Sequence, residues 1–195
     1  MVIFLYVCLA TFISAGCVHK SSGWNIQEPT APCDTCIKGV TNFAKVTPVL
    51  WRGAQPTEEG FVNLEREGAR TIVSLRAYHD DALLLQQTGL KYVSIRANAW
   101  HPEKEDMLLF LKVLEDQNNW PIFVHCAYGE DRTGYAIATY RIVEEGWSPE
   151  QAIKEMKSFH FNRIWFNNEN FLRRIDVQEM KADLTPTNGS ASSNW

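Results

Sequence analysis

The sequence has no excess of positive charge. Its 19 Lys and Arg residues are outnumbered by 23 Asp and Glu residues, and the formal net charge is -4. Nucleic-acid phosphates are bound by clustered Lys and Arg side chains, so we expect no nucleic-acid partner.

No internal repeat is visible in the sequence. The 195 residues, 45% of them hydrophobic, supply one compact domain with short flanking segments and leave no room for a second domain.

Cysteine is scarce, and no second cysteine pair is present that would complete a zinc site. The five cysteines are Cys8, Cys17, Cys33, Cys36 and Cys126. Cys33 and Cys36 form a lone Cys-x-x-Cys pair, whereas a structural zinc site needs about four ligands. The pair predicts a disulfide, with half of a zinc site or a redox role as alternatives. Cys126 is left without a partner, and an unpaired thiol in an exported protein needs a specific reason.

Charged side chains are absent from residues 1–18. An apolar run there is followed by the small residues Ser14, Ala15 and Gly16 and then by Cys17, which is typical of an export segment. Cleavage before Cys17, with a lipid on its sulfur, would anchor the protein at the periplasmic face of a bacterial membrane. No Lys or Arg lies near the start, and Ser14 stands where such sites usually carry Leu. An ordinary secretory signal or an uncleaved anchor therefore remains as an alternative.

Composition divides the chain into four parts. Residues 1–16 are the expected export signal, and 17–41, rich in Ser, Gly and Pro, are expected to be a tether. Residues 42–182 form the predicted folded domain. The Ser- and Asn-rich residues 183–195 are expected to be a disordered tail.

Within the domain, β-branched apolar runs alternate with amphipathic segments. This predicts an α/β fold with a central, mostly parallel sheet flanked by helices. The predicted strands are Thr47–Trp51, Thr71–Leu75, Tyr92–Ile95 and Ile122–His125. The predicted helices are Glu58–Glu67, Asp80–Gln87, Glu105–Gln117, Gly134–Glu145 and Pro149–Ser158, the last with a capping box on Ser148 and Gln151.

Residues 126–134 join a buried strand to a helix. The N-terminus of a helix offers unpaired N–H groups and the positive end of the helix dipole, so this turn favours an anion. The same field stabilises a thiolate, the reactive form of cysteine, at Cys126. Arg132 lies six positions later, where its planar guanidinium can hold two phosphoryl oxygens. Gly129 permits a tight curl of the backbone, and the Thr133 hydroxyl can stabilise the thiolate.

The run from His125 to Gly134 resembles the phosphate-binding loop of the protein tyrosine and dual-specificity phosphatase superfamily, which reads His-Cys, five residues, Arg, then Ser or Thr. Asn42–Val46, Leu50–Pro56 and Thr71–Arg76 are similar to the atypical, bacterial-type dual-specificity phosphatases. The resemblance implies a phosphocysteine on Cys126, phosphate held by Arg132 and the loop, turnover aided by Thr133, and no metal or organic cofactor. It implies that His125 orients the loop, and that the substrate is bound by Ala127, Tyr128, Gly129, Glu130 and Gly134.

The general acid is not obvious. Such enzymes usually protonate the leaving group from an Asp on a separate loop, but residues 97–106 hold no aspartate in an unmistakable position. Asp131, inside the phosphate loop, is the preferred candidate. Glu103, Glu105 and Asp106 are the alternatives. Any of the four can instead be a solvated carboxylate or a helix cap, and Asp131 can instead form a salt bridge.

The expected function is an exported phosphatase that acts on a phosphorylated protein or a small phosphate ester, with phosphotyrosine, phosphoserine or phosphothreonine as the substrate group. A phosphoinositide or inositol phosphate phosphatase is the first alternative, although the negative charge of Glu130 and Asp131 argues mildly against inositol pyrophosphates. A sulfurtransferase or arsenate reductase and a non-catalytic phosphate-binding module are the alternatives from other classes.

Overall fold

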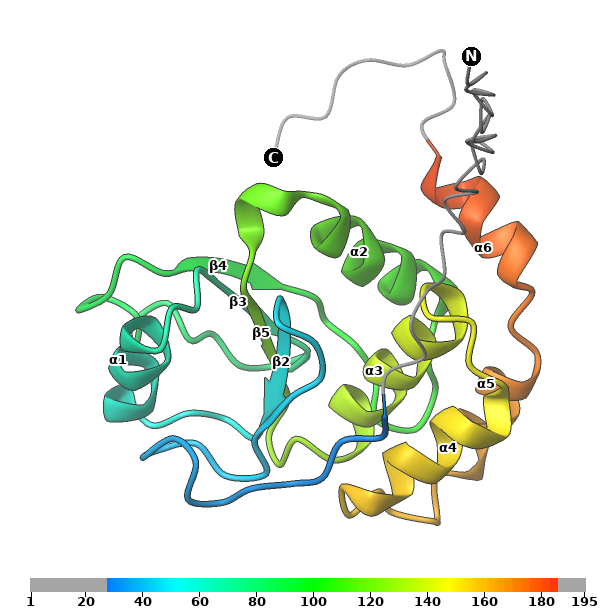
Figure 1. Cartoon of the computed structure of the whole chain (residues 1–195), viewed down its shortest axis with the longest axis horizontal. Helices are drawn as coiled ribbons and strands as arrows, with labels where there is room; N and C mark the ends of the chain where they lie inside the picture. The colour runs from blue at the N-terminus through cyan, green and yellow to red at the C-terminus, as the bar shows by residue number, and fades with distance from the viewer. Residues whose placement is uncertain (1–27, 186–195) are drawn as a thin grey trace, which may run out of the picture.

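A five-stranded sheet forms the centre of the protein (Figure 1). The computed structural model describes residues 28–185. In the sheet order β1-β2-β5-β3-β4, β1 is antiparallel to β2 and all other neighbours are parallel. The predicted α/β class with a mostly parallel sheet is therefore confirmed. The strands are β1 (Ala44–Lys45), β2 (Leu50–Gly53), β3 (Thr71–Ser74), β4 (Lys91–Ser94) and β5 (Ile122–His125).

The three central strands, β2, β3 and β5, are buried on both faces because helices cover both. Side chains of a strand alternate between the two faces, and in β5 Ile122 and Val124 enter one hydrophobic cluster while Phe123 enters the other. Every residue of β2, β3 and β5 is buried. This is the pattern of a parallel sheet enclosed between helices.

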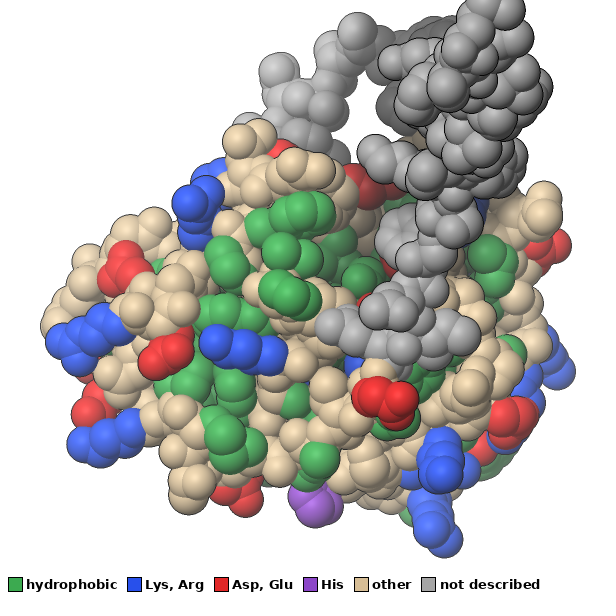
Figure 2. Space-filling view, in the orientation of Figure 1, with side chains coloured by type: hydrophobic (Ala, Val, Ile, Leu, Met, Phe, Trp, Pro, Cys, Tyr) green, Lys and Arg blue, Asp and Glu red, His purple; other side chains and the backbone are tan. Residues whose placement is uncertain are grey.

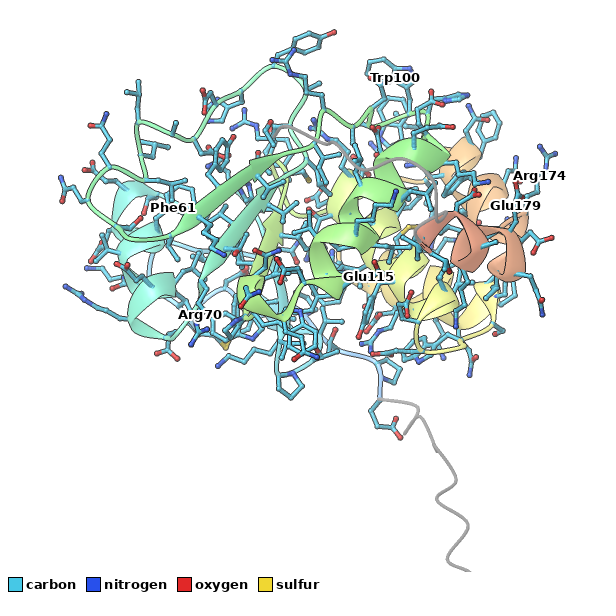
Figure 3. All side chains as sticks on the ribbon, turned by 90° about the horizontal axis from the view of Figure 1, so that it is seen from above. Phe61, Arg70, Trp100, Glu115, Arg174 and Glu179 are labelled. Carbon is cyan, nitrogen blue, oxygen red and sulfur yellow. A yellow bond between two sulfur atoms is a disulfide. The ribbon has the colours of Figure 1, made fainter. Side chains whose placement is uncertain are left out.

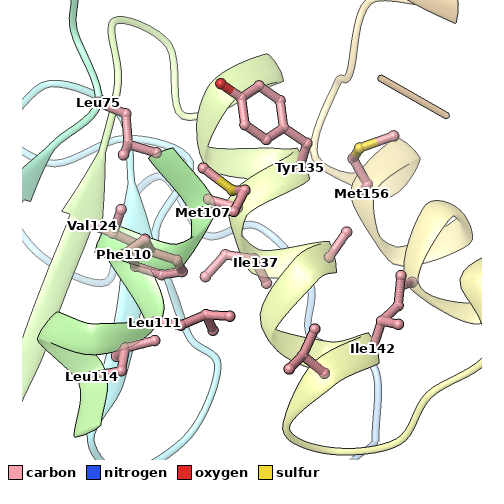
Figure 4. Packing of buried hydrophobic residues seen from close by; sticks show 14 of the residues in the cluster. Leu75, Met107, Phe110, Leu111, Leu114, Val124, Tyr135, Ile137, Ile142 and Met156 are labelled. Carbon is pink, nitrogen blue, oxygen red and sulfur yellow. The ribbon is translucent and has the colours of Figure 1, made fainter. Parts of the chain in front are cut away.

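Helix α1 (Glu58–Arg66) covers one face, and helices α2 (Lys104–Glu115) and α3 (Asp131–Val143) pack against the other (Figure 1). Figure 4 shows Phe110 of α2 and Ile137 of α3 meeting Val124 of the sheet. The remaining helices, α4 (Pro149–Ser158), α5 (Phe166–Arg173) and α6 (Val177–Leu184), pack outside α2 and α3. Helix α3 is thereby enclosed, with ten of its residues buried.

Helix starts follow the sequence. The side chain of Thr57 accepts a hydrogen bond from Gly60 N and caps α1. Ser148 and Gln151 form the predicted capping box of α4, with Pro149 in its first turn. Each cap satisfies backbone N–H groups that have no partner within the helix.

The predicted helix Asp80–Gln87 is wrong. Residues 82–87 are turns, and the amides of Leu84 and Leu85 both bond to the carbonyl of Asp81. The Asp81 side chain is fully buried, so this segment is placed by a tertiary contact. A single helical turn is unstable without further turns to extend it.

The domain limits also differ from the prediction. Ile37 and Val40 are buried in the cluster that α1 covers, and Cys33 pairs with Phe43 through backbone hydrogen bonds. The predicted tether is therefore wrong for residues 33–41, which belong to the folded domain. Helix α6 crosses the predicted boundary at residue 182. The export segment, with Cys8 and Cys17, and residues 186–195 of the expected tail lie outside the described residues.

A buried ion-pair network joins α3, α4 and the first described residues. The guanidinium of Arg141 is fully buried and donates to Glu155 at 2.9 and 2.7 Å and to Glu145 at 2.6 Å. Glu155 also accepts from both the amide and the hydroxyl of Thr30. A buried charge is tolerated when it is paired in this way. Between residues 28 and 185, no helix is both long and apolar enough to span a bilayer.

Candidate active site

The carboxyl ends of three parallel strands meet at one edge of the sheet. His125, the last residue of β5, is paired with Gly53 of β2 on one side and with Ser74 of β3 on the other. Cys126 follows directly and is 3% exposed. In open α/β sheets, ligands bind at this edge. The phosphate loop, residues 126–132, therefore lies at the position where such a fold places its ligand.

The N–H groups of the phosphate loop precede the first hydrogen bond of α3, which runs from Gly134 N to the carbonyl of Glu130 at 2.8 Å. The amides ahead of Gly134 consequently have no acceptor within the helix. Two side chains beside them are similarly unsatisfied. Arg132 Nε and Thr133 Oγ1 are buried and have no hydrogen-bond partner among residues 28–185. These donors suit an oxyanion with several oxygens.

The carbonyl groups of residues 126–129 in the same loop each face a donor. Cys126 O lies 3.2 Å from His125 Nδ1, Ala127 O accepts from Gln55 N, and Tyr128 O accepts from Asn42 Nδ2 at 3.1 Å. Gly129 O accepts from Arg52 Nη2 at 2.6 Å. Carbonyls that face the protein and amides that face outward are the arrangement of an anion-binding loop.

Gly129 is the tightest point of the curl. Its φ is +70°, in the left-handed region that favours glycine. A Cβ at this position would lie 2.5 Å from the carbonyl carbon of Gly53 and 2.7 Å from Ala54 N. The loop therefore approaches the end of β2 backbone to backbone, and only glycine fits there.

Arg52 supports the loop from below, a role that the sequence did not reveal. Its side chain is fully buried, with the guanidinium 3.6 Å above the ring of Phe159. Burial lowers the pKa of Arg52 to about 10, against the opposing effects of Glu155 and Cys126. Arg52 Nε and Nη1 have no hydrogen-bond partner within the described part of the chain. An arginine in the middle of an otherwise apolar strand was the available signal.

Asn42 supports the loop from its outer side. Its φ is +53°, and its side chain reaches the carbonyls of Tyr128 and Phe159. Its own amide donates to Asp34 Oδ1 at 2.9 Å. Asp34 lies between Cys33 and Cys36, which form a disulfide. The disulfide thus closes a small loop that holds Asn42 in place.

Asp131, the preferred general acid, is engaged by the segment that follows α4. Its Oδ1 accepts from Asn162 N at 3.0 Å and its Oδ2 accepts from Trp165 Nε1 at 3.1 Å. The ring of Trp165 lies 6.3 Å from that of Trp100, which Figure 3 shows at the outer edge of the molecule. Both oxygens of Asp131 therefore accept hydrogen bonds from N–H groups.

The alternative carboxylates lie at the start of α2. Glu103 and Glu105 are exposed, whereas Asp106 is half-buried. Burial, followed by the charges of Glu103 and Glu105, raises the pKa of Asp106. Burial also raises the pKa of Tyr135, with further electrostatic contributions from Asp106, Arg132 and Cys126. Tyr135 is thus within electrostatic range of both Asp106 and the phosphate loop.

The rim of the loop is acidic on one side. A hollow of about 400 Å³ is lined in part by Asp34, Tyr128, Glu130 and His160. Burial raises the pKa of Glu130, and the charge of Asp131 raises it further. On the face that Figure 2 shows, Lys and Arg side chains are interspersed with Asp and Glu and form no continuous basic area.

This fold and this loop define a phosphatase of the protein tyrosine and dual-specificity superfamily. Residues 36–174 match the family described as "DSP-PTPase phosphatase fused to NAD+ Kinase". The chain belongs to this family and is a phosphoric monoester hydrolase of the dual-specificity type. The superfamily predicted from the His125–Gly134 loop is therefore confirmed.

Two relatives differ in the substrates that their names state. The chain is 28% identical to the dual specificity protein phosphatase TpbA of Pseudomonas aeruginosa over 182 residues, 92% of this chain and 79% of that protein. It is 28% identical over 159 residues to the inositol diphosphatase SIW14 of Saccharomyces cerevisiae, covering 75% of this chain and 55% of that protein. A crystal structure of a Cys-to-Ser variant of TpbA in complex with phosphotyrosine has a TM-score of 0.64 at 25% identity, covering 75% of this chain and 90% of that one.

Gly129→Ala tests the backbone contact with β2. Gly146 is a matched control, because its φ is also +70° but a Cβ there meets nothing within 4 Å. We expect Gly146→Ala to cost about 1–2 kcal/mol of stability and to retain activity. Gly129→Ala should in addition lower kcat/KM by at least about 100-fold, because the loop must shift away from Gly53. Equal activity of the two variants, measured with an aryl phosphate, would contradict this account of the loop.

Proposed function

We propose that this protein removes phosphate from phosphotyrosine-type monoesters through a phosphocysteine intermediate on Cys126. This proposal rests on the phosphate loop. The protein supplies donors to the carbonyls of residues 126–129, whereas the loop amides and Arg132 Nε remain available to bind an oxyanion. The thiolate attacks phosphorus, the P–S bond forms and the P–O bond to the alcohol breaks. Water then cleaves the P–S bond, with Thr133 stabilising the thiolate as it leaves.

This mechanism can be distinguished by experiment from the alternative functions, a phosphate-binding module and a sulfurtransferase. A Cys126→Ser variant should retain binding of the phosphoester and lose turnover, whereas a binding module would have no turnover to lose. A sulfurtransferase would turn over thiosulfate instead of an aryl phosphate.

We propose Asp106 rather than Asp131 as the general acid. An acid must carry its proton at the working pH, and the environment of Asp106 raises its pKa. Both carboxylate oxygens of Asp131 already accept hydrogen bonds, from Asn162 N and Trp165 Nε1, so neither oxygen is free to face a leaving group. Asp106 would donate its proton to the leaving oxygen and recover one from the attacking water.

Asp106→Asn and Asp131→Asn form the matched pair that tests this assignment. Asp106→Asn should lower kcat about 100-fold or more for an alkyl phosphate, which needs a proton on its leaving group. It should have much less effect for an aryl phosphate with a good leaving group. The wild-type rate with the alkyl substrate should fall as the pH rises through the raised pKa of Asp106. The rate of the Asp106→Asn variant should not show this fall. The same leaving-group dependence in Asp131→Asn, and not in Asp106→Asn, would reverse the assignment.

For the substrate, the acidic rim favours a phosphorylated tyrosine over an inositol pyrophosphate. Asp34 and Glu130 line the hollow beside the loop, and Asp131 is the first residue of α3. A densely phosphorylated ring would bring several further negative charges there. The phosphotyrosine complex of TpbA supports the same choice.

Kinetics with a phosphotyrosine peptide and an inositol pyrophosphate test this preference. We expect the peptide to be hydrolysed with the higher kcat/KM. Glu130→Lys should reduce the difference in kcat/KM between the two substrates. It should raise activity toward the pyrophosphate, because it replaces a repulsive charge with an attractive one. A wild-type preference for the pyrophosphate would refute the proposal, while Cys126→Ser serves as the inactive control.

We also propose that the protein is exported and anchored to a bacterial membrane through a lipid on Cys17. The uncharged apolar run and the small residues before Cys17 support this. In the native bacterial host, the wild-type protein should be found in the membrane fraction and should incorporate labelled fatty acid. Cys17→Ser should incorporate none. Labelling that persists in the variant would show that Cys17 is not the lipidated residue.

A further inference from the structure

Asp81 lies behind the phosphate loop and does not form part of its rim. Its carboxylate is fully buried, with Oδ2 at 3.2 Å from His125 Nε2. Its Oδ1 accepts from Gln55 Nε2 at 2.7 Å and lies 3.0 Å from His79 Nε2. A carboxylate buried so completely is costly unless charged or hydrogen-bonding groups compensate it. Here an amide and two imidazoles surround it.

Each ring nitrogen of His125 faces an oxygen atom. Its Nδ1 faces the carbonyl oxygen of Cys126 at 3.2 Å, and its Nε2 faces Asp81. A carbonyl oxygen can only accept a hydrogen bond, and so can an ionised carboxylate. Both ring nitrogens of His125 thus face oxygens that only accept, and an imidazolium is the form in which both nitrogens are donors. The Nε2 of His125 and the Oδ2 of Asp81 lie at ion-pair distance without meeting in hydrogen-bond geometry.

The ionised state of Asp81 is supported by its surroundings. Burial by itself would raise the pKa of Asp81, but the contacts with His125, Gln55 and His79 outweigh burial and lower it. The carboxylate thus stays charged near neutral pH and cannot donate a proton to the ring.

We propose that Asp81 is a positioning residue that holds His125 as an imidazolium directly behind Cys126. This inference rests on the proposed role of Cys126 as the nucleophile. The imidazolium places a positive charge one residue from the thiolate and donates to the carbonyl that starts the phosphate loop. It would therefore both orient the loop and favour the thiolate.

The other neighbours of His125 cannot replace Asp81. Helix α1 presents only the ring of Phe61, with its centroid 6.2 Å away, and β5 presents the ring of Phe123 (Figure 3 labels Phe61). Among residues 28–185, Asp81 is the one carboxylate within ion-pair distance of the His125 ring. The remaining titratable, charged or polar groups around the pair include Arg52, Gln55, Arg76, His79, Cys126 and Tyr92, whose hydroxyl accepts from Asp81 N at 3.2 Å.

The first experiment observes the protons directly. Ring-nitrogen NMR of the isotopically labelled full chain near neutral pH should show both nitrogens of His125 protonated. A neutral ring with a single protonated nitrogen would overturn the proposal. This readout needs no turnover, so a failure here would leave the proposed phosphatase mechanism standing.

The second experiment compares Asp81→Asn with Asp80→Asn. Asp80 is exposed and its Oδ1 accepts from Ala82 N, so its variant is a control for charge on the same segment. The rate of Cys126 alkylation by iodoacetate, followed by peptide mapping across a pH series, reports the thiolate. We expect the midpoint to move up by about one pH unit in Asp81→Asn and to stay in place in Asp80→Asn.

Activity should follow the same pattern. The kcat/KM of Asp81→Asn should fall roughly tenfold at acidic pH, corresponding to a shift of about one pH unit, and should approach the wild-type value at high pH. A purely structural defect would lower kcat/KM at every pH and leave the alkylation midpoint unchanged, which would overturn the proposal. If Asp81→Asn does not fold, the NMR result for the wild-type chain decides. If Cys126 is not alkylated at any pH, the nucleophile assignment fails and the protonation state of His125 is still measured.

Discussion

The structure of this phosphatase depends on hydrogen-bond donors that hold the backbone carbonyls of the phosphate loop toward the protein interior. A loop that directs its N–H groups toward a phosphate must direct its C=O groups into the protein, where each needs a donor. Four consecutive carbonyls, from Cys126 to Gly129, face a donor from His125, Gln55, Asn42 and Arg52 respectively. The next carbonyl, that of Glu130, accepts the first hydrogen bond of α3. The loop geometry is therefore supplied mainly by residues remote in the sequence.

The same requirement brings positive charge into the interior. Arg52 is fully buried beneath the loop, and Arg132 has a buried Nε that lacks a partner among residues 28–185. An unpaired buried cation destabilises a fold, but here Arg52 holds the loop carbonyl of Gly129 in place and Arg132 Nε is left for a bound phosphate. The unpaired arginine atoms thus lower the stability of the fold, and they belong to an anion-binding site whose groups are in place before the substrate arrives.

Local sequence was enough to predict the phosphate loop, because Cys126, Gly129 and Arg132 lie within a few residues of each other at a strand-to-helix junction. It was not enough to predict the donors behind the loop. The predicted domain starts at Asn42, the predicted strand ends at Trp51, one residue before Arg52, and Asp81 lies in a predicted helix that does not form. Each of these side chains acquires its partner only when the sheet assembles, so no local pattern carries the signal.

The loop that follows β4 explains why the general acid could not be read from the sequence. Tyr135 Oη donates to Asn98 O and Asn168 Nδ2 donates to Ala99 O, so this segment is held against α3 and α5. The residues held in this way, Asn98 and Ala99, include no aspartate. In the proposed mechanism the proton donor lies instead on a helix, at the start of α2, where Asp106 is half-buried and burial raises its pKa. Under the proposed mechanism, a fixed helix supplies the acid where a mobile loop commonly does, and catalysis needs no closure of that loop to complete the site.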